Sequence, residues 1–175
     1  MSNLNPTELK RLHRGWRRQT EARLAIGLEG VQGPFNVGAI LRTAAAYKSE
    51  HLWLTPSATG PENAKVGKTA LGTERFMTVT RVDDGPALVD AARAAGFKVI
   101  GVELAHGAVP SFEADLTGDV CLVVGNEDHG MSKATMAACD ALIYLPQLGS
   151  VGSLNVASAA SIACYEWARQ QLVPS

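Results

Sequence analysis

The sequence predicts an α/β protein with a mainly parallel sheet and helices on both faces. Short apolar runs alternate with helical segments from Ala25 onward, as in successive βα units. Several apolar runs also stop abruptly in loops rich in Gly, Asn and Ser before a helix begins, most clearly within 122–132 and 144–167. Glycine removes the Cβ that holds a ligand off the backbone, so such loops are typical of binding sites.

The strands and helices can be assigned in chain order. An Ala-rich helix ending at Tyr47 follows the first strand, and a later helix has Pro86 near its start and Gly96 just past its end, as helix termini favour. The longest irregular segment is 105–119. The expected strands are 25–31, 51–54, 76–82, 97–104, 120–124 and 141–145, and the other expected helices are 64–71, 132–139 and 154–172.

Length and composition indicate one ordinary globular domain. The chain has 175 residues, 46% of them hydrophobic and 19% charged, and no apolar run reaches the roughly 20 residues that span a bilayer. The basic N-terminus lacks the apolar core of a secretory signal. Cys121, Cys139 and Cys164 are isolated, which favours a reducing cytoplasm and argues against a zinc site. We expect a cytoplasmic protein with no metal and no membrane contact.

The N-terminal segment is unusually basic. The charge between Glu8 and Arg23 is +4, against −5 for the rest of the chain, which suggests an arm that meets a polyanion. Leu9, Leu12 and Trp16 share one helical stripe, and Arg23 and Leu24 fall near it. The alternative is a solvated helix attached to the body by Leu12 and Trp16. The division expected is a basic helical arm, 1–24, and a domain, 25–175.

Four glycine-bearing loops follow strand ends, at 30–38, 101–107, 125–130 and 146–152. In a parallel sheet these ends meet at one edge, which is where α/β proteins bind ligands. The loops carry polar side chains that suit a site, although glycine often does no more than end an element. These side chains are Asn36, Glu127, Ser153 and Asn155.

Familiar nucleotide and metal signatures are missing. The segment 62–69 has Glu62 where a P-loop needs its first glycine, and no G-x-G-x-x-G follows the first strand. No H-E-x-x-H or G-x-S-x-G occurs, so Ser153 is not expected to be a nucleophile. The run 127–129 (Glu-Asp-His) is expected to be a polar turn, since a metal would lack further ligands there.

Arg42 is a charged residue inside an apolar helical run. A guanidinium keeps its charge at physiological pH and therefore needs a polar or anionic partner. From the sequence, that partner is Glu50, Glu74 or solvent in a structural role, and a phosphate or ribose in a functional one.

Three motifs in order carry a family resemblance. The segments GPFNVGAILRTAAA (33–46), LVVGNEDHGMS (122–132) and LPQLGSVGSLNVASAASIACYE (145–166) resemble the signature motifs of the SPOUT superfamily. With GKTALGTERF (67–76), they look most like its SpoU/TrmH branch of RNA ribose 2'-O-methyltransferases, and closest to those acting on a tRNA guanosine. The resemblance implies a C-terminal trefoil knot, an exception to the unknotted rule.

The resemblance also implies S-adenosylmethionine as cofactor and a homodimer whose site is completed by both chains. Arg42 is then expected to activate the ribose hydroxyl, with Asn36, Glu127, Ser153 and Asn155 positioning groups around it. The expected cofactor contacts are Val102, Glu103, Leu104, Gly125, Asn126, Leu145, Leu148, Ser153 and Leu154, and the expected RNA phosphate contacts are Lys10, Arg11, Arg14, Arg17 and Arg18. The small residues Ala157, Ser158, Ala160 and Ser161 suit either a dimer contact or the chain's own sheet.

The expected reaction is methylation of a ribose 2'-hydroxyl in RNA. The expected target is a guanosine of the tRNA D-loop, because the motifs resemble those enzymes most. Methylation of ribosomal RNA and a catalytically silent RNA-binding protein of the same fold are the alternatives. An ordinary doubly wound nucleotide enzyme is a third, which the missing glycine fingerprint disfavours.

Overall fold

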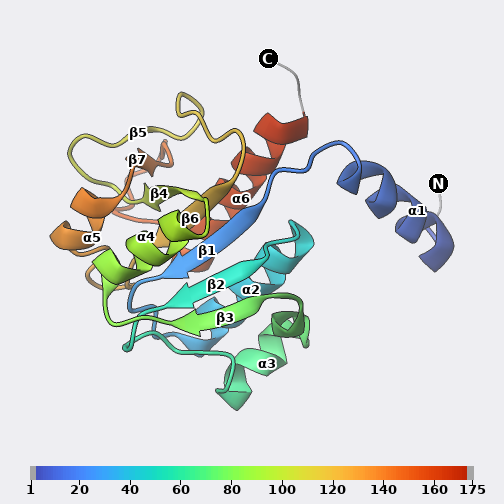
Figure 1. Cartoon of the computed structure of the whole chain (residues 1–175), viewed down its shortest axis with the longest axis horizontal. Coiled ribbons are helices and arrows are strands. Elements are labelled where there is room, and N and C mark those ends of the chain that lie inside the picture. The colour runs from blue at the N-terminus through green and yellow to red at the C-terminus, as the bar shows by residue number, and fades with distance from the viewer. Residues whose placement is uncertain (1–2, 173–175) are drawn as a thin grey trace.

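The computed structural model describes residues 3–172, so the ends of the expected arm (1–2) and of the expected domain (173–175) lie outside it. It shows one seven-stranded sheet in the order β3-β2-β1-β6-β4-β7-β5 (Figure 1). Every strand pair is parallel. The strands are β1 Leu24–Leu28, β2 His51–Leu54, β3 Thr78–Arg81, β4 Lys98–Val102, β5 Val109–Pro110, β6 Val120–Val124 and β7 Ala141–Tyr144.

Helices cover both faces of the sheet, which confirms the predicted α/β class. One face packs against α2, α3 and α6 through residues such as Ile26 and Leu122, and the other packs against α4 and α5 through Ala25 and Val123. The helices are α1 Pro6–Arg17, α2 Pro34–Ala46, α3 Ala64–Ala70, the 3₁₀ helix η1 Thr73–Phe76, α4 Gly85–Ala94, α5 Lys133–Ala138 and α6 Val156–Leu172.

The central strands explain why the apolar runs are continuous. All five residues of β1 and all five of β6 are buried, and they pair in register from Leu24 with Val120 to Leu28 with Val124. A strand buried on both faces has no polar face to alternate with. The carboxyl ends of these strands therefore deliver two loops side by side to one edge of the sheet.

The predicted boundaries differ from the observed ones by a few residues in most elements. Asp84 caps the start of α4, Pro86 lies in its first turn, and Gly96 after its end has φ of +90°. Two expectations are wrong. The segment 105–119 is not wholly irregular, because it contains β5, and the N-terminal stripe does not reach Arg23, because α1 ends at Arg17 and Leu24 begins β1.

Helix α1 projects from the body (Figure 1). Its start is fixed locally by Asn5 and Glu8, which form a capping box. The helix has no buried residue, and Leu12 and Trp16 keep 45% and 49% of their surface exposed. The expectation that these two side chains attach the helix to the body is therefore wrong for the single chain, since neither is removed from solvent.

The connection after α1 is attached to the sheet by Arg23. Its guanidinium lies 2.8 Å from a carboxylate oxygen of Asp119 and 4.5 Å from the ring centre of Phe97. Within residues 3–172, no helix combines the length and the apolarity that a membrane span requires.

Helix α6 uses its small residues mainly inside the chain. Ala157 and Ala160 are buried in the core, which confirms the interpretation that they face the protein's own sheet. Ser161 lies 3.0 Å from the hydroxyl of Thr43 on α2, while Ser158 is exposed. Only part of the expected small-residue surface is thus available to another molecule.

Candidate functional site at the carboxyl edge of the sheet

A cavity of about 600 Å³ lies where β4, β6 and β7 end. Its volume falls within the usual range of small-molecule sites. Three of the four predicted glycine loops supply its walls, and α2 contributes Asn36. The predicted residues that line it are Asn36, Val102, Glu103, Leu104, Gly125, Asn126, Glu127, Leu145, Ser153, Leu154 and Asn155.

Asn36 joins the three motifs at the cavity. Its Nδ2 donates to Oε1 of Glu127 at 3.0 Å, and its Oδ1 accepts from Nδ2 of Asn155 at 3.0 Å. Asn155 also accepts from the N–H of Ala157 at 3.0 Å, which caps the start of α6. One amide thus fixes the loop after β6 relative to the loop before α6.

Glu127 binds the start of α2 with both carboxylate oxygens. Oε2 accepts from the N–H of Gln32 at 3.0 Å and Oε1 from the N–H of Gly33 at 2.8 Å. Partial burial raises the pKa of Glu127, but the hydrogen bonds from Asn36 and these two backbone groups outweigh it, so its pKa lies below the ordinary value. Glu127 is therefore ionised at neutral pH and acts first as an anchor for α2.

Glycine is required where the loop after β6 turns back. A Cβ on Gly125 would lie 2.2 Å from the backbone of Gly130 and of Met131. Asn126 Oδ1 accepts from the N–H groups of Asp128 and His129 at 2.9 and 3.2 Å, which confirms the expected polar turn.

Two side chains outside this turn hold it in place. Glu103, after β4, accepts from the N–H of Met131 at 2.7 Å. Asn126 Nδ2 donates to the carbonyl of Gly30 at 2.7 Å, which links the turn to the loop after β1. The strand ends of β1, β4 and β6 are therefore cross-connected around the cavity.

The apolar part of the cavity contains Leu104, Leu145 and Leu154, as expected for a flat aromatic ligand group. Leu148 was expected to contact the cofactor, but the structure does not place it in this cavity. Its side chain is fully exposed and lies outside the cavity, because residues 147–155 form no helix or strand and their tip projects from the body.

Sequence reasoning missed other wall residues, notably Tyr144 and Gln147. The buried Oε1 of Gln147 has no hydrogen-bond partner among the described residues. The only sequence signal for them was the predicted glycine loop 146–152, which contains Gln147 and follows Tyr144 closely. Gln147 offers a ligand an acceptor that the protein itself does not use.

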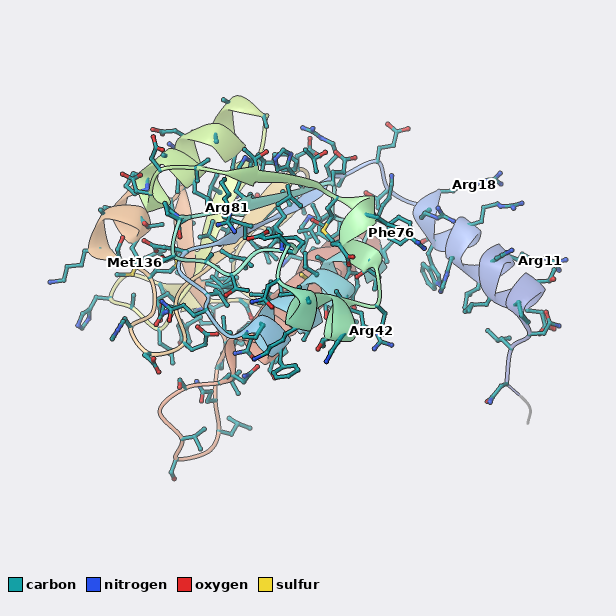
Figure 2. All side chains as sticks on the ribbon, turned by 90° about the horizontal axis from the view of Figure 1, so that it is seen from below. Arg11, Arg18, Arg42, Phe76, Arg81 and Met136 are labelled. Atoms are coloured by element: carbon teal, nitrogen blue, oxygen red, sulfur yellow. The ribbon has the colours of Figure 1, made fainter. Side chains whose placement is uncertain are left out.

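Arg42 lies apart from this cavity. It is on α2, six residues beyond Asn36, or about 9 Å along the helix axis. It lines a second cavity, on the side of the body that faces α1 (Figure 2). Among the described residues no carboxylate forms an ion pair with it, and Glu50 lies instead 3.9 Å from Arg23, so pairing with Glu50 or Glu74 is not observed.

The predicted basic residues of the arm are exposed, and none forms an ion pair with a described carboxylate. Figure 2 shows Arg11 and Arg18 pointing away from the body. Arg17 instead lines the second cavity. The set comprises Lys10, Arg11, Arg14, Arg17 and Arg18.

Comparison with known proteins supports a single family. The sequence model of the SpoU rRNA methylase family matches residues 23–165. The 23S rRNA (guanosine-2'-O-)-methyltransferase RlmB of Vibrio parahaemolyticus is 35% identical over 156 residues, which are 88% of this chain and 62% of that protein. The chain thus spans less than two thirds of the length of this relative.

Solved structures agree. The SpoU methyltransferase AviRb from Streptomyces viridochromogenes, in complex with AdoMet, has a TM-score of 0.77 at 31% identity, covering 87% of this chain and 62% of that one. The TrmH/SpoU tRNA modifying enzyme of A. aeolicus has a TM-score of 0.74 at 28% identity, covering 93% of this chain and 83% of that one. The fold is thus shared with methyltransferases of this type.

Proposed function

The chain belongs to the SpoU methylase family, and from this premise we propose that it transfers a methyl group from S-adenosylmethionine to a ribose 2'-hydroxyl of RNA. The observation that carries the proposal is the cavity at the carboxyl edge, where the three family motifs meet through the hydrogen bonds of Asn36.

The residues of the cavity fit S-adenosylmethionine. The volume of about 600 Å³ accommodates a nucleoside with its amino acid extension. Leu104, Leu145 and Leu154 provide apolar contacts for adenine, and the unpartnered Oε1 of Gln147 suits an amino group. Gly125 keeps the wall free of a side chain, so that the ligand meets backbone.

The bound cofactor supplies an electrophilic methyl group on a sulfonium, and the protein supplies orientation. We assign the positioning of the loops to Asn36, Glu127 and Asn155, with Ser153 in the third loop. Arg42 is the residue that readies the ribose hydroxyl. A guanidinium is too weak a base to remove the proton, so Arg42 polarises the hydroxyl by bridging it to the neighbouring phosphate.

The position of Arg42 supports a homodimeric site. Phe35 and Arg42 are seven residues apart on α2 and so share one helix face, and Phe35 is 63% exposed. Ile162 on the adjacent α6 is 45% exposed. We propose that a second chain covers Phe35 and Ile162 with its own copy of this surface, and that Arg42 then serves the cofactor cavity of the partner subunit.

The remaining structural expectations follow from the same family membership. We propose that the C-terminal part of the domain is threaded as a trefoil knot, and that 1–24 acts as an arm on the domain 25–175. The exposed cations of the arm suit RNA phosphates. Location in the cytoplasm stays a prediction, supported by three free cysteines.

Two RNA substrates have support. The motif resemblance favours a guanosine in the tRNA D-loop, and a tRNA modifying enzyme is among the structural neighbours. The names of the curated relatives favour a guanosine of 23S rRNA. We propose tRNA as the first substrate and ribosomal RNA as the second. A catalytically silent RNA-binding protein is disfavoured because Asn36, Glu127 and Asn155 form a complete network.

The deciding experiment incubates the full chain with labelled S-adenosylmethionine and separated pools of tRNA and ribosomal RNA. Digestion to nucleosides then identifies the modified nucleotide. We expect labelled 2'-O-methylguanosine from the tRNA pool. Label found only in ribosomal RNA would favour ribosomal RNA as the substrate. If calorimetry detected no binding of S-adenosylmethionine, the chain would instead be a catalytically silent RNA-binding protein.

A further inference from the structure

A second cavity, which we call the α1 groove, lies between α1, the end of α2, η1 and the C-terminal half of α6. Its volume is about 1300 Å³, roughly twice that of the cofactor cavity. Figure 2 shows Phe76 and Arg42 on the side of the body that faces α1. Arg42, to which we assign the ribose, is thus a wall residue of this larger space.

Exposed aromatic side chains line the α1 groove from three elements. Trp16 of α1 is 49% exposed, Phe76 of η1 is 61% exposed, and Tyr165 of α6 is 59% exposed. Large aromatic side chains left in water and gathered at one site mark a binding surface. Flat rings with free faces suit a partner that is itself flat, such as an unstacked nucleobase.

The charge of the α1 groove selects an anionic partner. Its lining contains one carboxylate, that of Glu50, against five cationic side chains. Arg75 lies with its guanidinium carbon 4.9 Å from the ring centre of Phe76, so a cation flanks an aromatic surface. Only one of the five, Arg169, has an ion-pair partner among the described residues. The cations are Arg17, Arg42, Lys48, Arg75 and Arg169.

We propose that the α1 groove binds unpaired nucleotides next to the target ribose. Their bases stack on Phe76 and Trp16, and their phosphates bind Arg17 and Arg75. A duplex is excluded from this mode because its bases already stack on one another, so the groove selects a single-stranded or loop segment. The proposal rests on the proposed function for the identity of the RNA, but the stacking itself does not require methyl transfer.

Intrinsic fluorescence gives a direct test. The chain has three tryptophans, and Trp53 and Trp167 are 3% and 4% exposed, so solvent-accessible emission comes from Trp16. A single-stranded RNA of about ten nucleotides is expected to quench it. The same strand annealed to its complement is expected to quench it far less. Equal quenching by both, or none by the single strand, would overturn the proposal.

A matched pair of variants tests the stacking surface. Phe76 and Phe112 are 61% and 62% exposed, but only Phe76 lines the α1 groove, so Phe112→Ala controls for the loss of an exposed ring. We expect Phe76→Ala to weaken binding of the single strand about tenfold, Phe76→Tyr to retain it, and Phe112→Ala to leave it unchanged. Equal affinities of Phe76→Ala and Phe112→Ala would contradict the proposal.

The charge contribution has a separate readout. Arg75→Ala is expected to reduce the slope of log affinity against log salt by about 0.7, the value for one phosphate contact to a single strand. An unchanged slope would remove Arg75 from the site. If sedimentation instead showed that Phe76→Ala dissociates a dimer while RNA affinity stays constant, the groove would be a contact between copies of this chain, against the proposal.

Calorimetry with S-adenosylhomocysteine separates this proposal from the proposed function. Phe76→Ala is expected to bind it like the unaltered chain, because Phe76 does not line the cofactor cavity. If the unaltered chain failed to bind it yet single-stranded RNA still quenched Trp16, the α1 groove would stand and the methyltransferase assignment would fall.

Discussion

Asn36 and Glu127, which are 91 residues apart in the chain, are joined by a hydrogen bond of 3.0 Å. The bond connects the first turn of α2 with the loop after β6, and the remaining oxygen of Asn36 binds Asn155 before α6. One side-chain amide thus holds together the start of α2, the loop after β6 and the loop before α6. The first two predictions address this contact.

Asn36→Asp places a second carboxylate beside Glu127, and like charges at this separation repel. We expect urea denaturation at pH 7 to show a loss of about 1–3 kcal/mol, as for a broken hydrogen bond to a charged group. The loss should shrink as the pH falls and the pair takes up a proton. Asn36→Leu is the control, because it also removes the hydrogen bond to Glu127 but adds no charge, so its cost should vary much less with pH.

Glu127→Gln tests the pH dependence of the anchor. Because the folded-state pKa of Glu127 is depressed, its contribution is present above the unfolded-state pKa and disappears as the pH falls through the folded-state value. The charge-dependent part of the stability difference between the unaltered chain and Glu127→Gln is therefore expected to be full near pH 7, to start falling near the ordinary glutamate pKa of about 4.3, and to be lost only below the depressed folded-state pKa. Equal differences at pH 7 and pH 3 would mean that the charge of Glu127 contributes nothing.

Much of the fold could be predicted from the sequence, because the apolar runs that mark the strands are local features of the chain. The runs at 51–54 and 120–124 match β2 and β6 in both bounds. All five residues of β6 are buried, and a strand buried on both faces is apolar throughout. The common edge of the glycine loops followed from parallel strand direction alone. The pairing of Asn36 with Glu127 and Asn155 did not, because it depends on strand register and loop geometry that no local pattern encodes.

The positions of Arg42 and Leu148 could not be predicted from the segments in which they lie. Arg42 shares a motif with Asn36 but lines another cavity. Six residues along an α-helix change both the direction of a side chain and its position along the axis, so the two side chains do not meet. Leu148 was expected at the cofactor because of the family resemblance, yet its apolar side chain lies exposed in an irregular loop. Apolar character predicts burial well in strands and poorly in loops, where no periodic face is defined.

Gly125→Ala is expected to disrupt the loop after β6. Its added Cβ would lie 2.2 Å from the backbone of Gly130 and Met131, which cannot rotate away as a side chain can. We expect a cost of about 1–3 kcal/mol or more in thermal unfolding and weaker cofactor binding. Gly149→Ala is the matched control, since its Cβ would meet nothing within 4 Å. Equal melting temperatures for the two variants would contradict the close approach.

The cysteines are expected to react slowly. Burial, followed by the charges of Asp140 and Glu29, raises the pKa of Cys139 to about 11, and burial raises the pKa of Cys164 to about 12. At pH 8 the thiolate fraction of Cys139 is then about a hundredfold below that of a free cysteine. Alkylation by iodoacetamide, followed by mass spectrometry, should label Cys139 first and only slowly. Rapid labelling of Cys164 in the folded chain would mean that α6 opens readily.

Arg42→Ala is expected to abolish methyl transfer while leaving S-adenosylhomocysteine affinity unchanged, because Arg42 does not line the cofactor cavity. Lys133→Ala, which removes an exposed cation from α5, is the control and should retain activity. Turnover of Arg42→Ala equal to that of the unaltered chain would remove Arg42 from the mechanism.

Mixing two inactive variants tests whether Arg42 serves the partner subunit. Leu104 lines the cofactor cavity and is 54% exposed, so Leu104→Arg should block the cofactor without unfolding the chain. Exchange of equal amounts of Arg42→Ala and Leu104→Arg makes half of the dimers mixed, and each mixed dimer has one site free of both defects if the site is shared. About a quarter of the unaltered activity should then return. If Arg42 acted on the cavity of its own chain, every site in the mixture would carry a defect and no activity would appear.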